Sequence, residues 1–229
     1  MPNWCNTSIH FESKDITAIT DFHNRLSKVR SEKVDRPSTS FQGGWLGDIA
    51  KEFLPEKYHY NEKTGEAKIR LRGKVDNLSD LEDDGDKKEF IVTTETAWEP
   101  MINIWFLINK LVYKGKFDIS FVAEEPGMEI YQKYGDYYDS DSFHIEGQLG
   151  DYVSEYFDTV EGIKSWILDE LSELGLVRSD LEGISVQEVE EKFDKAAKEK
   201  DPRNWVSIHE FQYLNEKDLG LEDDGEQEM

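Results

Sequence analysis

The 229-residue sequence predicts a fold of the α+β class. Alternating and β-branched runs that are typical of strands are interleaved with two helical patterns in the first half of the chain. Apolar residues make up 37% of the chain and aromatic residues 12%, which is enough for a packed core. The second half adds two further helical patterns and most of the acidic residues.

The elements of the first half follow the order strand, helix, strand, strand, helix, strand. They are expected at residues 7–13, 16–30, 67–73, 89–97, 101–113 and 116–123. This order predicts a ferredoxin-like βαββαβ antiparallel sheet with both helices on one face, and with the first and third strands in the middle. Ile9 and Phe11 are then core residues, joined by Phe90 and Val92 or by Ile91, depending on which face the third strand turns inward.

Three further regions complete the prediction. Residues 31–66 are longer than an ordinary loop, so we expect structure or function of their own there, including a short helix that ends at Pro55. A hairpin of Met128–Tyr134 and Ser142–Glu146 would extend the sheet. Helices are expected over residues 161–174 and, after a capping box, 186–200, followed by a strand at 204–214.

We therefore expect three parts in the chain. Residues 1–150 form the ferredoxin-like domain with its sheet extension, and residues 151–217 form an acidic helical extension packed on it. Residues 218–229 form a disordered acidic tail.

The net charge of −23 is unevenly distributed, since residues 1–125 carry −4 and residues 126–229 carry −19. Such a field repels nucleic-acid phosphates and anionic membranes and attracts basic partners. No apolar run approaches the roughly 20 residues that span a bilayer. A single cysteine, Cys5, excludes an internal disulfide, and the N-terminus has no secretory pattern, so we expect a cytoplasmic protein.

Motifs of catalysis are absent from the sequence: it has no nucleophile elbow, phosphate-binding loop or dinucleotide fingerprint. His10, His144 and His209 lie in expected strands and could converge only if those strands align; we interpret them, and Cys5, as structural. No cofactor and no metal are therefore expected.

Carboxylates beside an aromatic ring are the best candidates for a site. Trp98 and Glu99 end one expected strand, and Glu124 and Glu125 end another. Such a group could perform acid–base chemistry or bind a cation over the Trp98 ring. The competing interpretation is that Pro100 and Pro126 set turns there and that the acids face water.

Three motifs also carry a resemblance: Met1-Pro2-Asn3-Trp4-Cys5-Asn6, Thr96-Ala97-Trp98-Glu99-Pro100 and Glu124-Glu125-Pro126-Gly127. Over about residues 1–150 the chain resembles the YubB ferredoxin-like domain family of plasmid, phage and other mobile-element proteins. The resemblance implies a ferredoxin-like domain and a mobile-element origin, and brings no catalytic residues. The tryptophan- and glycine-rich segment usual before the family's second strand is matched only loosely, by Gly43-Gly44-Trp45.

Three functions remain open. The first is a non-enzymatic protein-binding module, encoded by a mobile element, with a basic host protein as partner and no direct contact with nucleic acid or membrane. The second is an acidic nucleic-acid mimic that inhibits a host DNA-binding or defence protein, which requires rows of acids on rigid elements. The third is a small enzyme that uses Glu99, Glu124 or Glu125 near Trp98.

Overall fold

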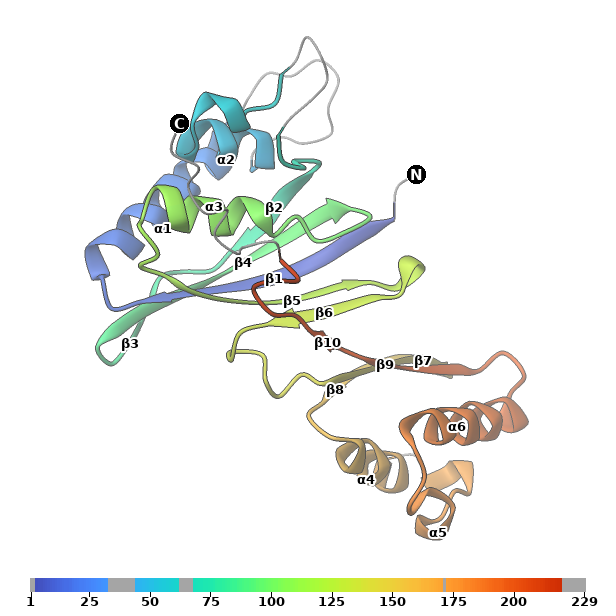
Figure 1. Ribbon diagram of the computed structural model, residues 1–229. Helices are drawn as coiled ribbons and strands as arrows, with labels where there is room; N and C mark the ends of the chain where they lie inside the picture. The colour runs from blue at the N-terminus through green and yellow to red at the C-terminus, as the bar shows by residue number, and fades with distance from the viewer. Residues whose placement is uncertain (1–2, 33–43, 62–67, 171, 220–229) are drawn as a thin grey trace. The chain divides into compact units, whose positions relative to one another are not determined.

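A computed structural model describes residues 3–32, 44–61, 68–170 and 172–219 (Figure 1). Strands and helices are both present, which confirms the α+β class. The chain divides into two units, residues 1–137 with 213–229, and residues 138–212. Their hydrophobic cores share no described residue.

The first unit is built on a seven-stranded sheet in the order β10-β6-β5-β1-β4-β2, with β3 paired to β4. Its strands are β1 (Trp4–Ser13), β2 (Gly73–Leu78), β3 (Glu82–Asp84), β4 (Lys87–Ala97), β5 (Asp118–Glu125), β6 (Ile130–Tyr134) and β10 (Gln212–Tyr213). β1 lies at the centre, antiparallel to β4 on one side and to β5 on the other.

Three helices lie on one side of this sheet: α1 (Ile16–Ser31), α2 (Leu46–Phe53) and α3 (Asn103–Leu111) (Figure 1). Single 3-10 turns occur at η1 (Glu56–Tyr58) and η2 (Pro126–Met128). α1 begins where expected, because the Asp15 carboxylate accepts the Ala18 N–H at 2.9 Å. The helix expected before Pro55 is α2, which presents Leu46, Ile49 and Phe53 to the core.

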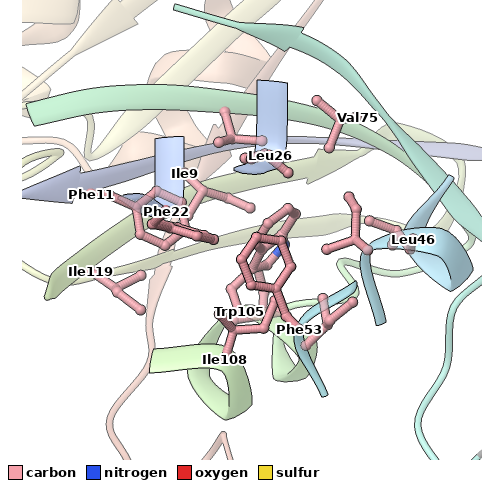
Figure 2. Packing of buried hydrophobic residues seen from close by; sticks show 14 of the residues in the cluster. Ile9, Phe11, Phe22, Leu26, Leu46, Phe53, Val75, Trp105, Ile108 and Ile119 are labelled. Atoms are coloured by element: carbon pink, nitrogen blue, oxygen red, sulfur yellow. The ribbon is translucent and has the colours of Figure 1, made fainter. Parts of the chain in front are cut away.

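Aromatic rings fill the space between the sheet and the helices (Figure 2). The Phe11 ring lies 5.2 Å from the rings of both Phe22 and Phe90, and 5.8 Å from Trp105, measured between centroids. Phe90 stands opposite Phe11 in the β1–β4 register, as Val92 stands opposite Ile9. The third predicted strand therefore turns Phe90 and Val92 inward.

The second strand was predicted too early. Ala67 lies outside the described residues, Lys68–Arg72 are not in a strand, and β2 begins at Gly73. A Cβ at Gly73 would come within 2.7 Å of both the Thr96 side chain and the Glu95 carbonyl oxygen. β2 therefore begins its close approach to β4 at Gly73, where the absence of a side chain avoids a clash.

The second unit has a three-stranded sheet in the order β8-β7-β9. Its elements are β7 (Phe143–Leu149), β8 (Asp151–Phe157), α4 (Val160–Glu170), η3 (Ser172–Leu174), α5 (Arg178–Leu181), α6 (Val186–Lys200) and β9 (Trp205–Glu210). The capping box expected before α6 is present, since Ser185 and Glu188 bond each other's backbone N–H groups. The buried core is formed by Phe143, Ile145, Ile163, Ile167, Leu181, Val189, Phe193, Ala197, Val206 and Ile208.

The predicted domain boundaries need correction. β7, expected to extend the first sheet, pairs with β8 and β9, because Phe143 and Ile145 bury against apolar residues of the acidic helices. The first unit therefore stops at 137 instead of 150, and residues 151–217 are not only helical. The chain returns to the first sheet at β10, where the Leu214 N–H donates to the Lys133 carbonyl at 2.8 Å. The tail expected at 218–229 lies outside the described residues from 220 onward.

Within the described ranges, every helix is too short or too polar to cross a membrane.

Replacing Phe11 with alanine is expected to lower the free energy of unfolding of the first unit by about 3–5 kcal/mol, because Phe11 is fully buried among four other aromatic rings. Urea denaturation followed by circular dichroism measures the change. Ile16→Ala, at a residue that is 39% exposed, is the control and should change stability by about 0.5 kcal/mol or less. Equal effects of the two substitutions would contradict the packing described above.

Residues 138–212 are expected to fold when expressed alone, because their core uses no side chain from the first unit. A cooperative thermal transition by circular dichroism, with protection of the amides of β7 from hydrogen exchange, would support this. A spectrum of an unfolded chain would show that the second unit depends on the first.

Candidate functional site

The face of the first sheet that points away from the helices carries polar side chains. Along β1, Ile9 and Phe11 point to the core, so His10 and Glu12 point to this open face. Glu89 of β4 stands opposite Glu12, and Ser120 of β5 stands opposite His10. Strand pairing therefore gathers polar side chains from β1, β4 and β5 on one face.

His10 is the most constrained of these groups. It is only 2% exposed, and its Nε2 donates to Glu89 Oε2 at 3.0 Å. The Tyr137 ring stacks on the imidazole with centroids 3.6 Å apart. Burial lowers the pKa of His10, and the hydrogen bond to Glu89 opposes this shift only in part. The imidazole is therefore held in one orientation and favoured in its neutral form.

Glu12 is held by a lysine. Lys87 Nζ lies 2.6 Å from Glu12 Oε2 and 3.6 Å from Asp84 Oδ2. One donor atom each from His10, Glu12 and Glu89 lies within 4.8 Å of the others, a spacing compatible with metal coordination. We call these three residues the His10 cluster.

The His10 cluster borders a groove of about 1000 Å³. The groove lies where the pairing of β5 with β6 ends, at Phe121 and Tyr134, and it is lined both by His10 of the open face and by Phe106 of α3. After Tyr134 the chain crosses toward the open face, where Tyr137 stacks on His10. Gly135, at φ +76°, permits this crossing, because a Cβ there would lie 2.3 Å from Ser120 Oγ. Among the residues that the structure describes, the groove is lined by one ammonium group, that of Lys87, and by the carboxylates of Glu12, Asp118, Asp136 and Glu216. It is also lined by the rings of Phe106, Phe117, Tyr134, Tyr137 and Tyr213.

The residues chosen from the sequence lie elsewhere, at one end of the first sheet. Trp4 pairs with Ala97, next to Trp98, and Asn6 pairs with Glu124. The three motifs that carry the family resemblance thus meet at the same end of the sheet, on either side of the start of β1.

Contacts within the protein occupy most of these side chains. Glu99 forms an ion pair with Arg70, and the Arg72 guanidinium lies over the Trp98 ring, 4.6 Å from its centroid. Glu125 is 3% exposed, and its Oε1 accepts the Gly127 N–H at 3.2 Å. Trp98 itself has φ +70°, and its N–H donates to the Asn3 carbonyl. These contacts fit the part of that interpretation in which the motifs build turns, but Glu125 does not face water, since it is buried and its Oε2 has no hydrogen-bond partner among the described residues. Glu124 points to the open face, opposite Asn6.

Two of the three strand histidines do align, in the second unit. His144 of β7 stands opposite His209 of β9, with ring centroids 6.4 Å apart. His209 Nε2 donates to Glu146 Oε1 at 3.2 Å, and Tyr156 stacks on His144. His10 belongs to the other unit.

No known protein-family model and no curated protein matches the chain. Among solved structures, the crystal structure of a "putative glycine cleavage system transcriptional repressor" aligns with 90% of this chain and 96% of its own, at 8% identity and a TM-score of 0.25. A TM-score this low carries no argument about fold or function. The evidence for a functional site therefore comes from the geometry of this structure alone.

The His10 cluster is not predicted from the sequence, although part of its signal is present there. Residues two apart on a strand share a face, so His10 and Glu12 form a pair that the sequence alone could have indicated. Glu89 and Tyr137 carry no such local signal, since only strand pairing and the chain crossing at Gly135 bring them to His10.

Cys5 is expected to react slowly with a disulfide reagent at pH 8 in the native protein. It is fully buried, and burial raises the pKa of its thiol from 9.0 to about 11, which lowers the thiolate fraction about 100-fold. Absorbance of the released thiolate measures the rate. The control is the same protein unfolded in ~8 M urea, where Cys5 should react at the rate of a free cysteine. Rapid labelling without denaturant would show that Cys5 is accessible.

Proposed function

We propose that this chain is a non-enzymatic protein-binding module that takes a basic segment of a partner protein in the groove beside the His10 cluster. The observation that carries the proposal is the composition of the groove wall, where four carboxylates face one ammonium group among aromatic rings. Arginine and lysine side chains fit such a wall, because carboxylates pair with their charge and aromatic faces attract it.

The charge of the second unit supports a basic partner. Residues 138–212 contain 19 acidic and 7 basic residues, a net charge of −12. A field of this sign raises the association rate of cationic surfaces and repels phosphate backbones. We therefore propose a basic protein as the partner, and not a nucleic acid.

We also propose that the first unit is a ferredoxin-like domain of the YubB type from a mobile element, acting in the cytoplasm. The strand order β5-β1-β4-β2, with helices inserted after β1 and β4, supports the fold. The meeting of the three motifs at one end of the sheet supports a shared architecture.

The two alternatives have less support. A nucleic-acid mimic needs rows of acids on rigid elements, but α6 mixes five acidic with four basic residues, and pairs such as Lys198–Asp194 and Lys195–Glu199 tie them together. An enzyme built on Glu99, Glu124 or Glu125 would use a carboxylate paired with Arg70, one opposite Asn6 on the open face, or one buried at a turn.

Neutralising the groove is expected to weaken binding of a fluorescent, arginine-rich octapeptide. Three exposed pairs at roughly 0.5 kcal/mol each correspond to about a tenfold rise in Kd for the triple variant Asp118→Asn, Asp136→Asn, Glu216→Gln. Fluorescence anisotropy at several salt concentrations measures the effect.

The matched control makes the same change in net charge outside the groove, with Glu56→Gln, Asp80→Asn and Glu129→Gln at exposed positions. It should change Kd less than about twofold, since distant charges are screened at physiological salt. If both triple variants weaken the peptide equally, binding reflects net charge alone and the groove is not the site.

A further inference from the structure

We propose that the His10 cluster binds a divalent transition-metal ion on the floor of the groove. The inference stands on the arrangement of three donor side chains and requires no protein partner, so it goes beyond the proposed function.

The donor atoms have the separations that a metal ion needs. His10 Nε2 and Glu89 Oε2 are 3.0 Å apart, and every donor atom of the set lies within 4.8 Å of the others. Two ligands that bind one ion at about 2.1 Å in tetrahedral geometry are about 3.4 Å apart. Small rotations of the glutamate side chains cover the difference, since both carboxylates are only partly buried. Coordination through His10 Nε2 requires the neutral imidazole to carry its proton on Nδ1, so the metal bond replaces the Nε2–H hydrogen bond to Glu89.

The scaffold holds the donors in place. His10 and Glu12 are on β1 and Glu89 is on β4, and Glu12 and Glu89 are directly paired in the sheet. The stacked Tyr137 ring fixes the plane of the imidazole. Ligands on paired central strands are pre-organised, so little conformational entropy opposes binding.

The donor types select the class of ion. One imidazole nitrogen and two carboxylate oxygens suit ions such as Zn²⁺, Mn²⁺ or Fe²⁺, whereas Ca²⁺ and Mg²⁺ prefer an all-oxygen shell. Three protein ligands also leave at least one coordination position open. Because His10 and Glu12 line the groove, that position is accessible to water or to a ligand there.

The ammonium group of Lys87 already occupies a position beside the cluster where a metal cation would bind. This group, 2.6 Å from Glu12 Oε2, neutralises a carboxylate that the metal ion would use. Asp84, at 3.6 Å, offers the ammonium group another partner when the ion enters. Lys87 therefore competes with the metal, and its removal should strengthen metal binding, an effect that a purely structural ion pair would not produce.

The test uses the full chain with Zn²⁺ or Co²⁺ alone, without peptide, in a buffer with excess Mg²⁺ to saturate weak carboxylate sites. Isothermal titration gives Kd and stoichiometry for Zn²⁺, and Co²⁺ absorption in the visible range reports an ordered ligand shell. We expect one ion per chain, with Kd raised about tenfold or more by Glu89→Gln and lowered by Lys87→Met.

Two controls separate this site from other sources of affinity. Lys88→Met removes the neighbouring lysine, which pairs with Asp83 outside the cluster, and should leave Kd unchanged. His209→Gln alters the histidine pair of the second unit and should also have no effect. Circular dichroism verifies that each variant is folded.

The proposal is overturned if wild-type protein binds no ion under these conditions, or if Glu89→Gln binds as tightly as wild type. It is also overturned if Lys87→Met and Lys88→Met shift Kd by the same amount, which indicates a general charge effect, or if His209→Gln alone abolishes binding. Each result is independent of whether the groove takes a basic peptide.

Discussion

The structure of the first unit depends on the hydrogen bonding of β1 along both of its edges. Pairing with β4 and β5 fixes its register on two sides, so a slip of one residue would move every side chain to the wrong face. Ile9 and Phe11 then form the centre of the core, while His10 and Glu12 are held on the opposite face. The same ten-residue strand thus builds both the hydrophobic core and the floor of the groove.

The second unit is an insertion between two strands of the first sheet. The chain leaves after β6 and returns as β10, whose neighbour in the sheet is β6 itself. Because the inserted residues have their own apolar core, they can carry a net charge of −12 without unpaired acids entering an interior. Local pairs offset part of the repulsion; the Arg203 guanidinium, for example, lowers the pKa of Asp201 to about 2.

The carboxylates at the end of the first sheet and those of the groove differ in their contacts and exposure. Glu99 at the end of the sheet forms an ion pair with Arg70. Glu125 accepts the Gly127 N–H through Oε1, while its Oε2 is buried without a hydrogen-bond partner among the described residues. The groove acids Asp118 and Asp136 are exposed and face a volume large enough for a ligand. Recognisable motifs therefore mark turns here, whereas the groove is formed by residues without a motif.

Periodicity and capping are local properties, so the sequence alone determined the α+β class and the inward orientation of Ile9 and Phe11 on β1. It also determined the start of α1 after Asp15 and the capping box of α6. Pairing partners are not local, and only the tertiary structure decided that β2 begins at Gly73 and that β7 joins β8 and β9. The His10 cluster was decided in the same way, because Glu89 reaches His10 through a contact between residues 79 positions apart. Local patterns report which face of an element is buried, but the choice of neighbour depends on how all the buried faces fit together.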